Sequence, residues 1–389
     1  MIAMESLPRE IMLNILSKLP TPSLLNAKLV SRSWKNLAED PILIDLHFTH
    51  MASNNTNPCL ILHGDYPIQN QLYALYLYPH NNNVGLVKSI SSPPVPDFNV
   101  AASCNGWLCL SNSSKNTFHL YNPFNSDFME LPKSAHDQSS DFCTVLGFGF
   151  QAETKEYKIL KLSRVSGNVR GHRICGYGPP PNAEILTLGS LTWRSLGQIN
   201  YDPVQSASQV MVNGRLHWVN WPLRHHHNHR LISFDLSEEK FRLVPCPNSA
   251  AGFEGHGYHR LMLVNRGGCL SVVSNINYGS FEIWVMKEYG VRQSWRKEFN
   301  ISSEIPRELE EEVDPSFKIS RLYRRSFTRV VCSMKNGEIL LQYKCRTLVA
   351  YDPRHGTFTN IKIPGMPNMF EAVAHGGNLN GIDRLLTGL

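Results

Sequence analysis

The residues best suited to chemistry form a short run rich in histidine, Arg224 to Arg230, which reads Arg-His-His-His-Asn-His-Arg. Histidine is a frequent metal ligand, but a metal site needs ligands held at convergent positions by supporting hydrogen bonds. The run lies between Trp221-Pro222 and a strand-like segment, Leu231 to Asp235. We therefore expect a solvated polar loop with no metal and no other cofactor.

Cysteine is the second residue type that could hold a metal or react. The nine cysteines are odd in number and include no Cys-x-x-Cys pair, which argues against a zinc site. Most lie in apolar, strand-like runs, as expected for reduced and buried thiols in a cytoplasmic or nuclear protein. The cysteines are Cys59, Cys104, Cys109, Cys143, Cys175, Cys246, Cys269, Cys332 and Cys345.

Carboxylates offer no catalytic constellation. Glu254, Asp235 and Asp352 are isolated in the sequence, and the two aspartates occupy turn positions that favour local hydrogen bonds. A propeller glycosidase would need two facing carboxylates, and neither a Gly-x-Ser-x-Gly motif nor a phosphate loop is present. We therefore predict no catalytic residues and no enzymatic activity.

The strongest pattern is apolar and lies in Leu7 to Leu46. Proline at position 8 suits the start of a helix, and apolar residues then recur at helical spacing. Leu19-Pro20-Thr21-Pro22 ends this helix, Thr21 or Ser23 can cap a second, and Ser31 or Ser33 precedes a third that ends at Asp40-Pro41. Three short helices are thus expected here, and past residue 50 a helical period recurs only in the acidic stretch from Ser302 to Val313.

Forty residues cannot bury so much apolar surface among themselves. Burial of each large apolar side chain contributes roughly 1.5–3 kcal/mol, so a second surface is expected to cover the exposed face. Two candidates remain open, the rest of this chain or another protein.

The same residues carry a family resemblance. Leu7-Pro8, Glu10-Ile11, Ile15-Leu16, Leu19-Pro20 and Val30-Ser31-Arg32 with Trp34 follow one another as in an F-box, which we place at residues 4–47. The resemblance implies docking onto a Skp-like adaptor and, through it, a cullin. The adaptor-binding residues that it implies are Leu7, Pro8, Ile11, Ile15, Leu16, Leu19, Leu24, Val30 and Trp34.

Composition narrows the possible partners. The chain has 389 residues, 42% apolar and 18% charged, and its net charge of +6 is spread along the sequence. A nucleic-acid partner would require basic residues gathered on one face, so none is expected. No run of about 18 apolar residues and no signal sequence are present, so neither a membrane span nor secretion is expected.

Residues 47–57 are polar, so we expect a hinge there, followed by a mainly β body over residues 58–389. One module recurs about every fifty residues, as is typical of propeller blades. It opens with a tight turn before a strand, at Asn105-Gly106, Asn213-Gly214, Gly267-Gly268 and Asn336-Gly337. Such dipeptides favour type I′ hairpins.

About 24 strands predict about six blades, and residues 370–376 are expected to form a last strand that closes a blade begun near residue 59. The body resembles the F-box-associated domain of plant F-box proteins, which is similar in shape to kelch-type propellers. The motifs that carry this resemblance include Cys104-Asn105-Gly106-Trp107-Leu108, Gly147-Phe148-Gly149-Phe150, Ser190-Leu191-Thr192-Trp193-Arg194 and Val212-Asn213-Gly214-Arg215-Leu216-His217-Trp218.

Long loops on a rigid scaffold are the natural place for recognition. Three stand out, at residues 163–182, 222–230 and 302–327, and they supply the candidate target-binding residues Arg170, His172, His226, Arg324 and Arg325. The hypothesis is a substrate receptor of an SCF-type ubiquitin ligase that binds a protein target. The alternatives are a non-ligase scaffold, a propeller enzyme, and a receptor that needs a small ligand.

Overall fold

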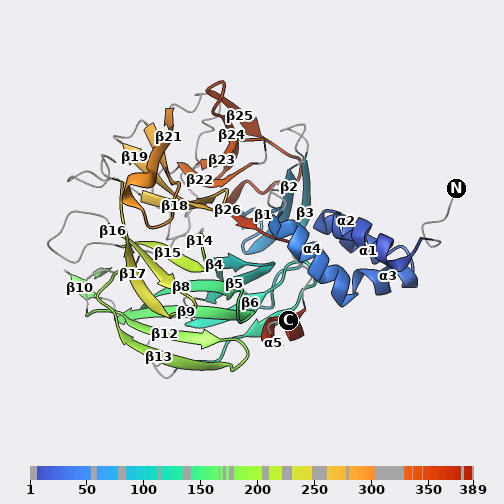
Figure 1. The fold of residues 1–389 in the computed structure, drawn as a ribbon, viewed down its shortest axis with the longest axis horizontal. Coiled ribbons are helices and arrows are strands. Elements are labelled where there is room, and N and C mark those ends of the chain that lie inside the picture. The colour runs from blue at the N-terminus through green and yellow to red at the C-terminus, as the bar shows by residue number, and fades with distance from the viewer. Residues whose placement is uncertain are drawn as a thin grey trace.

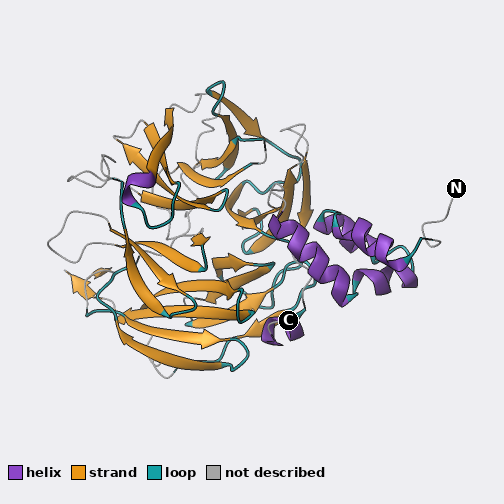
Figure 2. Ribbon diagram, in the orientation of Figure 1, coloured by secondary structure: helices purple, strands orange, loops and turns teal. Residues whose placement is uncertain are grey.

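A computed structural model describes most of the chain as an N-terminal group of helices beside a ring of β-sheets (Figures 1 and 2). The described residues are 7–53, 59–77, 85–112, 115–134, 142–165, 167–169, 172–174, 179–203, 210–220, 230–247, 261–276, 280–302, 328–334, 336–343, 345–377 and 381–387. Within these residues, no helix is both long and apolar enough to cross a membrane.

The first three helices lie where the sequence predicts them: α1 (Arg9–Ser17), α2 (Thr21–Ala27) and α3 (Arg32–Ala38). Pro8 immediately precedes α1, and its carbonyl accepts a hydrogen bond from the Met12 amide. Ser31 caps α3, because its hydroxyl accepts a 3.2 Å hydrogen bond from the Trp34 amide. Thr21 lies inside α2 rather than before it. We refer to the helices at residues 9–53 as the helical unit.

A fourth helix, α4 (Pro41–Ser53), corrects the expectation of only three helices in this region. Asp40 acts as its cap, since its Oδ1 accepts from the Ile42 amide at 2.9 Å and its carbonyl accepts from the Ile44 amide. The third helix does end before Asp40-Pro41, as predicted, but proline is also well suited to the first helical position, so the same pair begins α4. The expected hinge at residues 47–57 is therefore helical as far as Ser53, and residues 54–58 lie outside the described part.

In its described residues the body forms six four-stranded antiparallel sheets, which confirms the six-bladed propeller. The strands of each blade are named in order from the innermost to the outermost. The first three blades are β26 (Met369–His375), β1 (Cys59–Tyr66), β2 (Gln71–Leu77) and β3 (Gly85–Ser89); β4 (Asn99–Cys104), β5 (Trp107–Asn112), β6 (Thr117–Tyr121) and β7 (Phe128–Glu130); and β8 (Phe142–Gln151), β9 (Glu156–Val165), β12 (Asn182–Thr187) and β13 (Thr192–Gln198).

The remaining blades follow in chain order. They are β14 (Val210–Val212), β15 (Arg215–Asn220), β16 (Arg230–Asp235) and β17 (Lys240–Val244); β18 (Leu261–Arg266), β19 (Cys269–Ile276), β20 (Ser280–Met286) and β21 (Trp295–Ser302); and β22 (Thr328–Ser333), β23 (Ile339–Tyr343), β24 (Thr347–Asp352) and β25 (Thr357–Ile361). Outside the blades lie the hairpin of β10 (Gly167–Val169) and β11 (His172–Ile174), the 3₁₀ turn η2 (Arg292–Ser294) and a last helix, α5 (Ile382–Thr387).

The first blade closes the ring as expected. Strand β26, from the end of the chain, pairs antiparallel with β1, with Ile61 opposite Val373. The innermost strands surround the central axis, where β26 contacts both β4 and β22. The ring is thus held shut by hydrogen bonds between the two ends of the propeller sequence.

The tight turns explain much of the sequence repeat. Both central residues have positive φ at Asn105-Gly106, Asn213-Gly214 and Gly267-Gly268, as a type I′ hairpin requires. The fourth copy differs. Of Asn336 and Gly337, only Gly337 has positive φ, and the Met334 amide donates to the Glu338 carbonyl across a longer turn.

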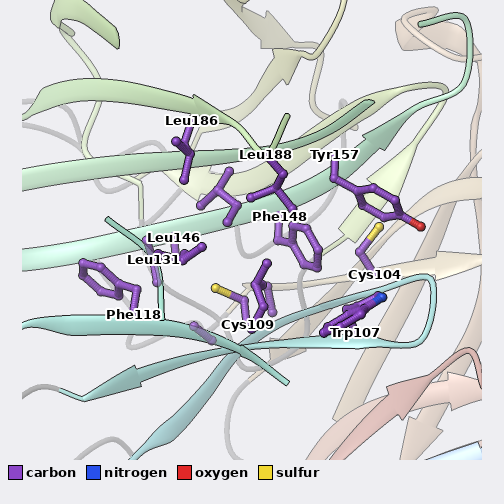
Figure 3. Packing of buried hydrophobic residues seen from close by; sticks show 14 of the residues in the cluster. Cys104, Trp107, Cys109, Phe118, Leu131, Leu146, Phe148, Tyr157, Leu186 and Leu188 are labelled. Carbon is purple, nitrogen blue, oxygen red and sulfur yellow. The ribbon is translucent and has the colours of Figure 1, made fainter. Parts of the chain in front are cut away.

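The apolar core is divided among the interfaces between neighbouring blades, one buried cluster at each. Figure 3 shows the cluster between the second and third blades, where Trp107 and Phe118 face Phe148 and Leu186. A seventh cluster, containing Leu13, lies within the helical unit. Each blade is therefore stable only beside its neighbours.

The antiparallel order gives the propeller two different faces. Connections from the first to the second strand and from the third to the fourth emerge on one face, and the others emerge on the opposite face. The tight turns and the helical unit share the first face, which we call the turn face. The strand ends that flank the three long segments, Val165, Asn220 and Ser302, lie on the opposite face, which we call the loop face.

Candidate functional site

The helical unit exposes an unusual amount of apolar surface. Twelve large apolar side chains are exposed in the described part of the chain, and half of them lie between Ile11 and Leu46. Isolated exposed apolar residues are common, but a concentration of this kind marks an interaction surface. We call this set the apolar surface; it consists of Ile11, Ile15, Leu29, Val30, Ile42 and Leu46.

Helix geometry explains why these residues are not covered by the unit itself. Successive residues are about 100° apart around a helix, so Ile11 and Ile15 lie together, nearly opposite Leu13 and Leu16. Leu13 and Leu16 are buried in the core of the unit, whereas Ile11 is 47% exposed and Ile15 is 40% exposed. Helix α1 is thus apolar on both sides, one packed and one open.

The predicted adaptor-binding residues divide into three groups. Pro8, Ile11, Ile15 and Val30 are exposed, and Leu7, Leu19 and Trp34 are half-buried. Leu16 and Leu24 are fully buried with Leu43 and Ala38, so they shape the unit from inside instead of presenting a surface. Periodicity identified the apolar positions but could not separate these two roles, because α4 fills one side of the bundle.

Three exposed apolar residues, Leu29, Ile42 and Leu46, were not identified from the sequence. Leu29 is 84% exposed, next to Val30, after the end of α2. Ile42 and Leu46 are four residues apart on α4, the helix that was not expected. Their i, i+4 spacing could have identified them as neighbours on one helix face. Asp40-Pro41 was interpreted only as a helix end, so no helix was expected at these positions.

In the described part of the chain, the propeller contacts the helical unit on one side only. Phe124, from the β6–β7 turn, packs against the core of the helical unit. Thr21 lies against Gly377, after β26. The propeller therefore covers one side of the helical unit and leaves the apolar surface open.

The candidate target-binding residues are only partly placed. Four of them lie outside the described residues: Arg170, His226, Arg324 and Arg325. His172 lies in β11, and its side chain is outside the described part of the structure. What the structure establishes is that the strands flanking these segments end on the loop face.

Charged groups inside the propeller are paired with one another. Lys161 and Glu184, both buried, lie 3.2 Å apart, and the Ser134 hydroxyl donates to the same carboxylate at 2.6 Å. Lys158 donates to Glu239 at 3.0 Å, joining the third blade to the fourth. These carboxylates join neighbouring strands and blades, which is a structural role.

The isolated aspartates also have local partners. The Asp235 carboxylate accepts from the Ser237 and Glu238 amides at 2.9 and 3.1 Å and from Arg215 at 2.8 Å. Burial alone would raise its pKa, but these hydrogen bonds outweigh burial and hold the pKa well below its usual range. Asp352 likewise accepts from the Arg354 amide at 2.9 Å.

Burial keeps four of the thiols and the ring of His217 uncharged near neutral pH. It raises the pKa values of Cys59, Cys104, Cys109 and Cys332 to about 12, and the cysteines that the structure describes are free of disulfides. Burial also lowers the pKa of His217 to about 4. Among the described residues, no three His, Cys, Asp or Glu side chains are grouped to hold a metal ion.

Two protein families match this sequence. Residues 66–381 match the family described as "F-box associated beta propeller domain", and residues 4–45 match the family described as "F-box-like".

Similar proteins from Arabidopsis thaliana carry matching names. F-box protein At3g07870 is 40% identical over 98% of this chain and 93% of its own length. F-box protein CPR1 is 24% identical, covering 95% of this chain and 87% of its own. F-box/kelch-repeat protein At3g23880 is 26% identical, covering 77% and 81%.

Proposed function

The chain belongs to the plant F-box proteins with an F-box associated β-propeller domain, and from this premise we propose that it is the substrate-recognition subunit of an SCF-type ubiquitin ligase. F-box domains bind Skp-like adaptors. In this proposal the helical unit docks on such an adaptor, which joins it to a cullin, and the propeller holds a protein target.

The observation that carries the proposal is the apolar surface of the helical unit. Its six side chains remain outside both the core of the unit and its contact with Phe124. Apolar surface removed from water contributes about 25 cal/mol per Å², so a partner with an apolar groove would be favoured at this place. The open side of α1 supplies two residues spaced for such a groove, Ile11 and Ile15.

The protein itself performs no chemistry in this proposal. Its contribution is proximity, since a bound target experiences a high effective concentration of the conjugating enzyme carried by other subunits. The loop face is proposed as the target-binding surface, because the longest connections leave the propeller there and the helical unit occupies the turn face. A cytoplasmic or nuclear location is part of the same proposal.

The test replaces two exposed residues. Ile11→Asp with Ile15→Asp should abolish co-purification of a Skp-like adaptor and the cullin, because two charges would enter the apolar contact. Thermal unfolding should stay close to that of the unchanged protein, since both side chains face solvent.

The matched control is Ile68→Asp with Leu243→Asp, two exposed apolar residues on the propeller, which should leave adaptor capture intact. Adaptor capture by the Ile11/Ile15 variant would reject docking through α1. Capture of an adaptor without a cullin by the unchanged protein would favour the non-ligase scaffold.

A further inference from the structure

Helix α5 lies between the propeller and the helical unit, near the C-terminus in Figure 1. Its apolar side belongs to the propeller. Leu385 is 1% exposed within the cluster between the second and third blades, and Ile382 and Leu386 pack against the same cluster. The Ile382 amide also donates to Asp127 Oδ2, in the β6–β7 turn, at 3.0 Å.

The polar side of α5 reaches the helical unit. Arg384 Nη1 donates to Asp45 Oδ1 at 2.6 Å, and Nη2 donates to the Pro41 carbonyl at 3.1 Å. Both acceptors belong to the first two turns of α4. One side chain of α5 thus holds the beginning of α4 at two points, and α5 itself is anchored in the propeller.

Two further contacts fix the same orientation. Phe124 packs into the core of the helical unit, and its ring centroid lies 5.5 Å from that of buried His375. A Cβ on Gly377 would lie 2.5 Å from Thr21 Oγ1, so α2 approaches the propeller backbone closely there. With Arg384 on α4, this makes three separate contacts, enough to set both the tilt and the rotation of the helical unit.

We propose that α5 is a brace that fixes the angle between the helical unit and the propeller. The inference deepens the proposed function and rests on it for its consequence. The adaptor would bind on the turn face and the target on the loop face, so this angle would set where the target lies relative to the conjugating enzyme. A misplaced target would lose the benefit of proximity even with both partners bound.

The test measures orientation in the free chain. Spin labels are introduced through non-canonical amino acids at two exposed positions, Asn14 on α1 and Lys240 on β17, and pulsed electron paramagnetic resonance gives their distance distribution. Arg384→Ala should widen this distribution, because it removes both contacts to α4. Reversing the pair, Arg384→Asp with Asp45→Arg, should narrow it again.

The matched control is Arg354→Ala, which removes an exposed arginine paired with Asp352 inside one turn of the sixth blade. It should leave the distribution unchanged. An unchanged distribution in Arg384→Ala, or equal widening in Arg354→Ala, would overturn the brace.

Adaptor capture separates this inference from the proposed function. Arg384→Ala should still capture the adaptor, because Ile11 and Ile15 are untouched. If the unchanged protein captures no adaptor and Arg384→Ala still widens the distribution, the brace stands and the ligase role fails. If capture succeeds and the distribution does not widen, the ligase role stands and the brace fails.

Discussion

The glycines of β8 show, at the scale of single residues, how a sequence motif can be structural. A Cβ on Gly147 would lie 2.7 Å from Trp218 Cζ2 and 2.8 Å from Leu216 Cδ1. Both neighbours are buried in the fourth blade. The Gly-Phe-Gly-Phe run therefore lets the fourth blade pack directly on the backbone of the third.

Gly147→Ala should destabilise the propeller by about 1–3 kcal/mol, because the buried neighbours must shift to admit the methyl group. The free energy of unfolding from urea titration checks this. Gly376→Ala is the control, since nothing lies within 4 Å of its Cβ position. Equal stability of the two variants would contradict the close packing.

Buried histidine predicts a pH dependence. The pKa of folded His217 is about 4, below its ordinary 6.5, because burial disfavours the charged ring. Between these values the unfolded chain binds more protons, so the stabilisation is complete above pH 6.5 and is lost as pH falls toward 4. We expect His217 to account for about 2 kcal/mol of the stability lost between pH 7 and pH 5.

The measurement is urea titration at both pH values. His217→Gln keeps a polar group opposite the Tyr289 hydroxyl, which lies 2.7 Å from His217 Nε2, and cannot titrate in this range. Its stability should fall less between pH 7 and pH 5. An unaltered pH dependence would mean that His217 already titrates normally in the fold.

Among the elements, α4 has the largest influence on the site. It closes the core of the helical unit with Leu43, exposes Ile42 and Leu46, and receives Arg384 from α5. Its formation depends on Asp40, which caps the helix and also binds Arg9. A single capping residue thus supports the helix that carries part of the apolar surface and that also receives Arg384.

Asp40→Ala should destabilise α4 by about 1–2 kcal/mol, because the Ile42 amide loses its partner. Faster hydrogen exchange of the α4 amides is the expected observation. Glu39→Ala, one residue earlier and exposed, should exchange as the unchanged protein does. Full protection of α4 without Asp40 would show that packing alone determines where it starts.

At the scale of the whole molecule, the last two elements of the chain, β26 and α5, make contacts with different parts of the protein. Strand β26 completes the first blade and buries Phe370 and Ala372 against the sixth, whereas α5 reaches the helical unit. Side chains of the sixth blade reinforce the closure, since Gln342 donates to the Phe370 carbonyl at 2.6 Å.

Deleting residues 369–389 should abolish cooperative thermal unfolding, because the first blade loses its innermost strand and the ring opens. Deleting only residues 382–389 should keep a cooperative transition, with the free energy of unfolding lowered by about 1.5–3 kcal/mol for buried Leu385 and by a further amount for Ile382 and Leu386. Calorimetry of both truncated chains checks this. A cooperative transition in the longer deletion would show that the ring does not need β26.

Several features followed from the sequence by itself because they depend on near neighbours in the chain. Asn-Gly and Gly-Gly pairs specify tight turns, short β-rich runs specify strands, and their repetition specifies six blades. The family resemblance rested on the same kind of local pattern, from Leu7-Pro8 to Trp34.

Other features were decided only by the tertiary structure. Leu16 and Ile15 look alike in the sequence, and packing of α4 buries one and leaves the other exposed. The division into a turn face and a loop face, and the reach of Arg384 to Asp45, join residues far apart in the chain. Burial and orientation depend on which surfaces meet after folding, and local residue patterns do not contain that information.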